Sequence, residues 1–331
     1  MLQQLPKPLS CRLALSRGAA LGDDRTMAHD PSEARRLWHA VEPLHAIAYF
    51  APETTAGWRD LGLRGFWMGY FASRSAPMGA VGPEAIIATF FNFHPAMVRR
   101  AIPDAWSYAA PEAVLETWRD TAVTALRRIL GPEPPTVSSF ATPGAELRTV
   151  GALSEAAALL RAACEGLDCA GRPLAAAWAG VPWRDEPLDD LWLGATILRE
   201  HRGDGHVGTL LAAELDGCAA HVLSVAADRN VREAIQPHRG WTDDDWASAQ
   251  ERLRGRGWLD ASGAITVEGR QVRADIEVQT DRLAMPPLSA LGPERTQQLL
   301  AALEPLTAAV WTAEGLPHPN PIGLPDGRPA P

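Results

Sequence analysis

The chain has 331 residues and a formal net charge of −9 at pH 7, and 46% of its residues are hydrophobic and 21% charged. This length allows two domains of ordinary size, and the composition is typical of a soluble globular protein without a membrane-spanning helix. The negative charge argues against non-specific binding to nucleic acid, although a local basic surface remains compatible with it.

The lysine and cysteine content limits the kinds of active site that the chain can form. Lys7 is the only lysine, which excludes a Schiff-base lysine and the lysine of a P-loop. The four cysteines contain no C-x-x-C pair, which favours a reduced, cytoplasmic protein. Because H-E-x-x-H is also missing, we predict no metal site, and we predict no cofactor.

The first third of the chain is predicted to be helical after a disordered extension over residues 1–27. Ser32 is predicted to cap a helix whose apolar residues are spaced three and four apart. Pro43 lies inside this helix and is expected to kink it or to mark a restart. A further helix is expected to begin near Gly65.

Helical patterns continue along the chain, separated by a linker. Two helices are predicted over 83–101 and 111–130, the second ending before a Gly-Pro pair. Residues 132–148 then form the linker. A helical pattern returns over 154–164, and again on both sides of a break that we expect at Gly203–Gly205. A flexible tail is expected over residues 316–331.

The clearest local signature lies between residues 242 and 270. Thr242 is predicted to cap a helix whose first turn is Asp243-Asp244-Asp245, where carboxylates favour the positive end of the helix dipole. Two short apolar pieces then predict a two-stranded wing over residues 258–267, and a helix follows from Glu268. This helix–wing–helix segment resembles the recognition helix and wing of MarR-type proteins.

Two parts of the chain resemble each other. Trp67–Arg74 is similar to Trp192–Arg199, with tryptophan, glycine and arginine at matching positions. Downstream, with a shift of one residue, Phe91–Val98 is similar to Leu215–Val222. Chance similarity between helices rich in alanine and leucine is the alternative explanation.

A third similarity joins the two ends of the chain. Leu37–Leu44 and Leu299–Leu306 both carry Glu-Pro-Leu within a helical pattern. The predicted fold is therefore mainly α, with tandem winged-helix (MarR-like) repeats at 28–131 and 149–291 that form a pseudo-dimer within one chain. A C-terminal helix at 292–315 is expected to pack on the N-terminal helix.

The chain also resembles an actinobacterial family of helix-turn-helix proteins over about residues 30–313. The resemblance depends on Glu42-Pro-Leu-His45, on Gly65-Phe-Trp-Met-Gly-Tyr-Phe71, and on Arg199-Glu-His-Arg-Gly-Asp-Gly-His206. It implies a fold type and does not imply an activity.

Ionisable residues are concentrated in the last of these segments, directly after an apolar run. His201 and His206 are the predicted acid–base groups, with Glu200 and Asp204 available to orient an imidazole and tune its pKa. A structural ion network is the alternative. The predicted substrate-binding residues are Arg199, Arg202, Tyr70, Trp67, Arg74, His45 and His94.

The same segment also contains a literal G-x-G-x-x-G, at Gly203–Gly208. A dinucleotide fingerprint requires a buried strand directly before its first glycine. The preceding Arg-Glu-His-Arg is too polar for such a strand. We therefore do not predict a dinucleotide site here.

The charges of the predicted recognition helix and wing bear on whether the chain binds DNA or a small molecule. The three aspartates that begin the predicted recognition helix would face phosphate, and the wing tip carries no Arg or Lys. The sequence thus favours a winged-helix scaffold that binds a small molecule between the repeats. It is predicted to be either an acid–base enzyme of specialised metabolism, of the lyase, cyclase or isomerase type, or a binding protein. A ligand-responsive DNA-binding regulator is the alternative. A monomeric pseudo-dimer or a homodimer is expected, away from membranes.

Overall fold

The computed structural model describes residues 30–131 and 143–313, with positions 315–317, 322, 324 and 327 of the tail, and its side chains from residue 151 onward in the second part. The described chain is mainly helical, as predicted. The predicted extension at 1–27 and most of the predicted linker lie outside these residues. The helices of the first part are α1 (Ser32–Phe50), α2 (Pro52–Asp60), α3 (Gly65–Ser75), the 3₁₀ turn η1 (Ala76–Met78), α4 (Pro83–Phe90), α5 (Pro95–Ala101), α6 (Ala105–Tyr108) and α7 (Pro111–Leu130).

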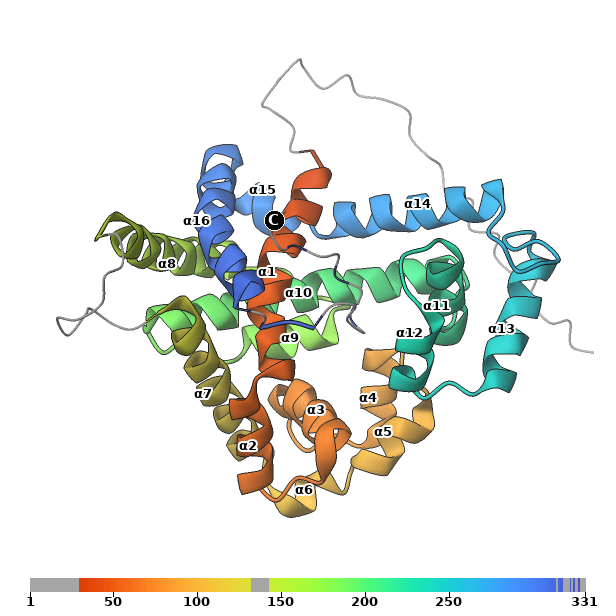
Figure 1. Cartoon of the computed structure of the whole chain (residues 1–331), viewed down its shortest axis with the longest axis horizontal. Coiled ribbons are helices and arrows are strands. Elements are labelled where there is room, and N and C mark those ends of the chain that lie inside the picture. Colours follow the sequence, from red (N-terminus) through yellow and green to blue (C-terminus); the bar gives the residue numbers. More distant parts are fainter. Residues whose placement is uncertain are drawn as a thin grey trace, which may run out of the picture.

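The second part is built around one long helix and ends near the first part (Figure 1). Helix α16 lies beside α1, where the Thr307 hydroxyl donates a hydrogen bond of 2.7 Å to the carbonyl oxygen of Ala40. Helix α8 begins inside the predicted linker. The helices are α8 (Pro143–Cys164), α9 (Pro173–Ala179), α10 (Pro187–Ala212), α11 (Gly217–Ala226), α12 (Arg232–Arg239), α13 (Asp243–Gly255), α14 (Val267–Leu283), α15 (Pro286–Leu291) and α16 (Pro293–Thr312).

Helix boundaries in the first part correct three local predictions. Ser32 begins α1 but does not cap it through its side chain; instead the Asp30 carboxylate accepts from the Ser32 amide at 2.9 Å. Pro43 does not end α1, so the restart, one of its two predicted effects, does not occur. Packing of this helix against α7, α10 and α16 offsets the lost backbone hydrogen bond. The segment 83–101 is two helices, since Phe91 adopts a positive φ of 38° and His94 caps α5.

Helix α10 runs without a break through Gly203 and Gly205, so the predicted interruption there is wrong. Gly205 and Gly208 of this helix lie in different environments. A Cβ at Gly205 would lie 2.7 Å from Arg172 Nη1 and 3.3 Å from Leu283 Cβ, so this glycine permits close packing of neighbouring elements. A Cβ at Gly208 would meet no atom within 4 Å. Packing on four helices, α8, α1, α14 and α9, holds α10 helical despite its glycines.

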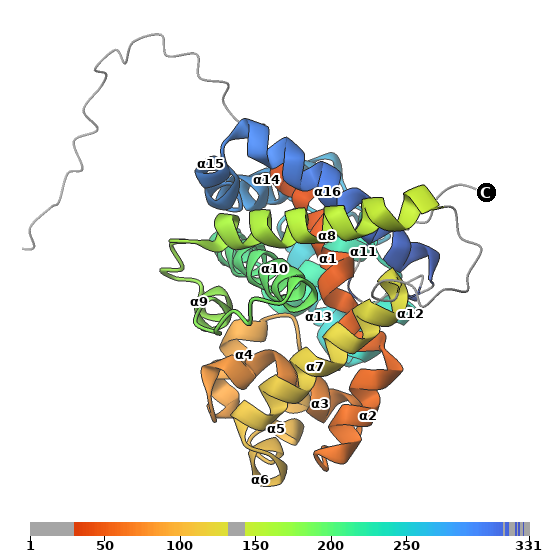
Figure 2. The same ribbon diagram turned by 90° about the vertical axis from the view of Figure 1, so that its left-hand side faces the viewer.

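Two hydrophobic cores divide the molecule. The larger lies among α1, α7, α8, α10 and α16 (Figure 2). Its centre holds Trp118, Trp178 and Trp192, whose rings meet edge to face at centroid distances of 5.4 to 5.6 Å. The smaller core lies among α11, α13 and α14 and includes Trp246 and Leu253. The segment 210–276 therefore has a core of its own.

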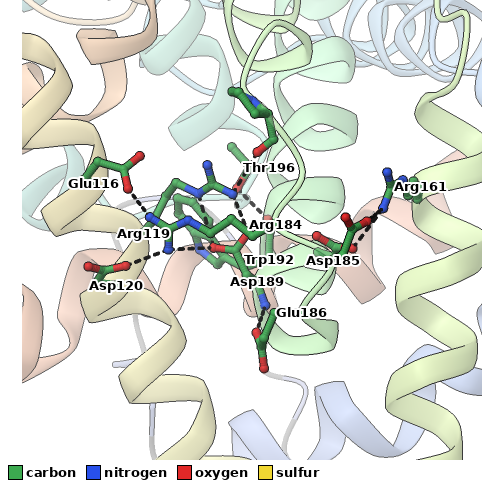
Figure 3. A network of polar contacts seen from close by, with 12 residues as sticks. Glu116, Arg119, Asp120, Arg161, Arg184, Asp185, Glu186, Asp189, Trp192 and Thr196 are labelled. Atoms are coloured by element: carbon green, nitrogen blue, oxygen red, sulfur yellow. Dashed lines mark hydrogen bonds and ion pairs between the residues drawn. The ribbon is translucent and has the colours of Figure 1, made fainter.

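A buried ion pair fastens the first part to the start of α10 (Figure 3). Arg119 of α7 donates to both carboxylate oxygens of Asp189, and each side chain is 2% exposed. Arg119 also donates to the carbonyl oxygen of Pro182 at 3.1 Å. Arg184 donates hydrogen bonds to Asp189 and, at the protein surface, to Asp120. Because both buried charges have partners, the pair fixes the approach of α7 to α10.

The segment after α11 confirms the predicted helix start and corrects the predicted wing. Thr242 and Asp245 form a reciprocal capping box at the start of α13. The two-stranded wing predicted over residues 258–267 is reduced to one antiparallel bridge between Leu259 and Ile265, and no strand is present in the described chain. Thr266 caps α14 directly after this bridge, which leaves no residues for longer strands.

In the described chain, no helix is by itself both long enough and apolar enough to cross a bilayer. Helices α10 and α11 meet the requirement only as a pair, with an angle of 93° between them.

Candidate ligand-binding site

A cavity of about 260 Å³ lies where the two cores meet. One wall comes from α3, α4 and the turn that follows α4, and the opposite wall comes from α11, α12 and α14. Helix α10 forms the floor with residues between Arg199 and Leu210 that cover about half of its circumference. The charged lining residues in the described chain are Glu42, Arg74, Arg199, Glu200, Arg202, Asp204, Arg229, Arg239, Arg273 and Glu277.

Glu200 is the centre of a buried ion network beside the cavity. It is 1% exposed and accepts from Arg74 at 2.9 Å, and its carboxylate lies 2.9 Å from Arg199 Nη1. Arg199 in turn donates to Glu42 at 2.8 Å. Burial would raise the pKa of Glu200, but the guanidinium groups of Arg199 and Arg74 outweigh it and hold that pKa below the usual value. The network joins α3, α10 and α1.

Asp204 is a lining carboxylate that titrates close to neutral pH. Burial, which disfavours the charged form, raises its pKa to about 6. Its Oδ2 accepts from the Ala175 amide at 2.9 Å, at the start of α9. In this structure neither Asp204 nor Glu200 is hydrogen-bonded to an imidazole, so their predicted orienting role is not seen.

The two predicted acid–base histidines lie on different faces of α10. His206 lines the cavity, and its Nδ1 lies 2.9 Å from Thr280 Oγ1. His201 is turned away from the cavity, near the backbone of Asp168 and the guanidinium of Arg172. Burial lowers the pKa of both histidines to about 4, so both are neutral at pH 7. Only His206 is placed to meet a ligand in the cavity.

Three other predicted residues lie outside the cavity wall. His45 is fully buried in the larger core, with Nδ1 2.8 Å from Thr196 Oγ1 and Nε2 2.6 Å from the Tyr49 hydroxyl. His94 caps α5 and packs against Trp241. Trp67 packs on neighbouring aromatic rings behind the wall. The remaining predicted residues, Tyr70, Arg74, Arg199 and Arg202, line the cavity.

The wall formed by α11, α12 and α14 carries residues that the sequence does not single out. Arg239 is buried at the end of α12, with its guanidinium 4.5 Å from the centre of the Phe93 ring. His221 of α11 lies with Nε2 3.2 Å from the carbonyl oxygen of Asn92. Glu277 of α14 pairs with Arg273 and lies 3.6 Å from Arg202. No local motif marks these positions, because folding brings them to the cavity from separate helices.

Within the described residues, no three His, Cys, Asp or Glu side chains are grouped as metal ligands. The literal G-x-G-x-x-G lies inside α10, whose amides are bonded within the helix and are not free to bind phosphate. The residues suited to ligand binding are therefore the arginines and the aromatic side chains of the cavity.

Comparison with known proteins places the chain in a family. No curated protein and no solved structure matches it. A family model described as a helix-turn-helix family matches residues 34–317, which is most of the chain. The protein therefore belongs to this helix-turn-helix family.

Proposed function

We propose that this protein is an enzyme that binds a small organic molecule in the cavity and moves a proton on it, as a lyase, cyclase or isomerase does. One observation carries this proposal. Asp204, whose pKa is raised to about 6, lines a cavity that also holds Arg74, Arg199 and Arg239. An acid that titrates near neutral pH can donate and accept a proton, and guanidinium groups stabilise a developing enolate or carboxylate.

His206 complements Asp204 in this proposal. Thr280 Oγ1 donates to the carbonyl oxygen of Ile276 at 2.7 Å, so it accepts from His206 Nδ1–H. The second nitrogen, Nε2, then carries the lone pair. A neutral imidazole with a fixed tautomer can accept a hydrogen bond from a substrate or an intermediate.

Filling the cavity tests ligand binding directly. Gly203 lines the cavity, and a Cβ there would meet only Glu200 Oε2 at 3.8 Å, so Gly203→Leu is expected to fold and to occupy ligand space. Leucine also favours the helix over glycine by roughly 0.5–1 kcal/mol. Saturation-transfer NMR with a panel of small organic acids and their neutral analogues should give signals with the wild type that this variant loses.

The matched control is Gly208→Leu, five residues along the same helix, where a side chain points into open space. It is expected to keep both the fold and the ligand signals. Equal binding by both variants would remove the cavity from the proposal. For any acid that binds and carries an ionisable C–H, the wild type should accelerate exchange of that proton with D₂O by roughly 100-fold or more. Asp204→Asn, which keeps an oxygen acceptor for the Ala175 amide, should abolish this acceleration.

We also propose that the chain is an internal pseudo-dimer of winged-helix-like units. In a two-fold dimer, residues near the axis contact their own equivalents. The matching arginines Arg74 and Arg199 both pair with Glu200. A Cβ at Gly217 would collide with the Phe91 carbonyl oxygen, so the second pair of similar segments also touches. Superposition of 67–98 on 192–222 tests this proposal.

Two further matches support the same arrangement. The matching glycines Gly69 and Gly194 both face a neighbouring helix closely: a Cβ would collide with Trp58 at the first and would lie 2.7 Å from Leu160 Cβ at the second. The third pair of similar segments belongs to α1 and α16, which are in contact. All three pairs of similar segments are thus mutual neighbours.

A ligand-responsive DNA-binding regulator is the second candidate. The match to a helix-turn-helix family favours it, as does the order α11, α12, α13, antiparallel bridge and α14. In such a protein α13 would be the recognition helix. Fold alone does not assign this activity.

The charges on α13 predict weak DNA binding. Each arginine near its end has a partner: Arg252 pairs with Asp216 at 2.5 Å, Arg254 with Glu251, and Arg256 lies 3.7 Å from the Trp258 ring centre. Engaged arginines and an acidic first turn reduce the counterion release that drives binding. Titration of random and genomic duplexes near physiological salt is expected to show no nanomolar, sequence-selective binding. Such binding would establish the second candidate instead.

A further inference from the structure

Tyr70 of α3 brings a phenol to the cavity wall. Its side chain is 6% exposed and lines the cavity. The hydroxyl oxygen accepts a hydrogen bond of 2.9 Å from Arg74 Nη1. A phenol can also donate one hydrogen bond, and the hydroxyl of Tyr70 donates to no acceptor among the described residues. Its proton is therefore available to a ligand.

The position and the polarity of this hydroxyl are set by its neighbours. The Tyr70 ring packs against Tyr49 and Phe93 at centroid distances of 5.1 and 5.6 Å. Arg74 binds Tyr70 through Nη1 and Glu200 through Nε and Nη2. Because a lone pair of the hydroxyl faces Arg74, the proton points away from it. The guanidinium also polarises the O–H bond, which makes it a stronger donor.

Asp204 of α10 lines the same cavity as Tyr70. Tyr70 and Arg74 lie one turn apart on α3, and Glu200 and Asp204 lie one turn apart on α10. The ion pair between Arg74 and Glu200 joins the two helices, and the charges of both residues act on Asp204. A ligand in the cavity thus has a hydrogen-bond donor on α3 and a carboxyl group on α10.

We infer that the substrate is a ketone, aldehyde or ester with an ionisable C–H beside its carbonyl group, and that Tyr70 donates a hydrogen bond to the carbonyl oxygen. This inference rests on the proposed function. The Asp204 carboxylate takes the proton, the C–H electron pair forms a C=C bond, and the C=O pair moves onto the oxygen. The charge passes from Asp204 to this oxygen, so the net charge of the cavity is unchanged. Return of the proton to either carbon completes the step without an oxidant or a reductant.

A phenolate imitates the enolate of this step, because both carry a negative oxygen on a planar, unsaturated carbon. An apolar cavity of about 150 Å³ takes one benzene molecule, so 260 Å³ takes such a ring with its substituents. The probe is 4-nitrophenol, and nitrobenzene is the same ring without the hydroxyl. Both are titrated into the Asp204→Asn variant, which has the uncharged form of this side chain and keeps an oxygen acceptor for the Ala175 amide.

In calorimetry above the pKa of free 4-nitrophenol, the phenolate should bind roughly tenfold or more tightly than nitrobenzene, because hydrogen bonds to charged groups are the stronger ones. Bound 4-nitrophenol should also ionise about one pH unit or more below the free compound, which the visible absorbance of the phenolate reports. Equal affinity for the two compounds, or no binding of 4-nitrophenol at millimolar concentration, would overturn the inference.

Two matched substitutions assign the donor. Adding Tyr70→Phe should remove the preference for the phenolate and leave nitrobenzene binding unchanged, which also shows that the cavity is intact. Arg74 keeps its bonds to Glu200 in this variant, since they use Nε and Nη2. Tyr49→Phe is the control, because its hydroxyl is bonded to His45 in the larger core and lies outside the cavity lining. It should keep the preference, and an unchanged preference in Tyr70→Phe contradicts the inference.

These outcomes separate the role of Tyr70 from the proposed function. If nitrobenzene binds as tightly as 4-nitrophenolate and Gly203→Leu abolishes both, the cavity still binds ligands and the role of Tyr70 is wrong. If Gly203→Leu leaves the binding of both compounds unchanged, they bind elsewhere, and both proposals fail.

Discussion

Replacing Glu200 with leucine is expected to lower the free energy of unfolding by about 3–5 kcal/mol, the cost of leaving a buried charge without its partner. Glu200 is 1% exposed and is the shared partner of Arg74 and Arg199. Leucine fills similar space, so the loss reports the charges and not a cavity. Urea unfolding at pH 7 measures it, with the slope on denaturant compared between variants.

Two further variants make this test specific. Glu84→Gln removes an ion pair with Arg99 whose side chains are 71% and 52% exposed, and it is expected to cost less than about 1 kcal/mol. Arg74→Met combined with Glu200→Leu removes one unpaired guanidinium and is expected to lose less than the sum of the single changes. A cost for Glu200→Leu as small as that of Glu84→Gln would show that water screens this network.

The apolar run that ends in charges correctly indicated ionisable groups at the edge of a buried region. What it could not give was the face on which each group lies, because the two glycines suggested a break. In an unbroken helix, successive residues are turned by about 100°, so positions five apart differ by about 140°. His206 lies on the part of α10 that lines the cavity, together with Arg199 and Gly203, whereas His201 lies outside that lining. Once α10 is known to be unbroken, the two histidines can be placed on different faces of the helix.

Three residues that line the cavity could not be predicted from the sequence as site residues. Asn92, His221 and Arg239 come from a turn and two short helices. Their positions depend on how the smaller core docks on the larger one, through contacts such as the hydrogen bond from Trp241 Nε1 to the Asn92 carbonyl oxygen. Such contacts leave no periodic pattern. Arg239, which the sequence presents only as one of many arginines, thus becomes a candidate ligand contact.

The cap of α13 was predicted correctly, unlike the cap at Ser32 and the strands of the wing. Thr242 and Asp245 satisfy each other's backbone within one turn, so four residues suffice to predict the start of α13. The wing depends on pairing across a turn. In the structure Asp260 Oδ1 accepts from the amides of Ser262 and Ala264, which closes the turn tightly after a single bridge. Apolar residues on both sides of a turn therefore do not ensure that two strands pair beyond a single bridge.

Acid is expected to destabilise the protein steeply between pH 6.5 and pH 4, because burial keeps several histidines neutral in the folded state. It lowers the pKa of His201 and His206 to about 4 and that of His221 to about 3, against about 6.5 in the unfolded chain. The unfolded state therefore binds protons first as the pH falls. The stability that these groups contribute is complete above pH 6.5 and is lost as the pH falls toward their folded values.

Asp204 acts in the opposite sense, since its folded pKa of about 6 lies above the ordinary aspartate value of 3.8, and its protonation favours the folded state as the pH falls. Burial also lowers the pKa of His45 and His39, so the histidines outweigh the one aspartate by at least about two protons, or roughly 3 kcal/mol or more per pH unit in this window. The combined variant His206→Asn and His221→Gln keeps a donor at each bonded nitrogen and removes both titrations. Urea unfolding at pH 7, 6 and 5 should show a much shallower loss in this variant than in the wild type. The same slope in both proteins would mean that these imidazoles are already protonated in the folded state.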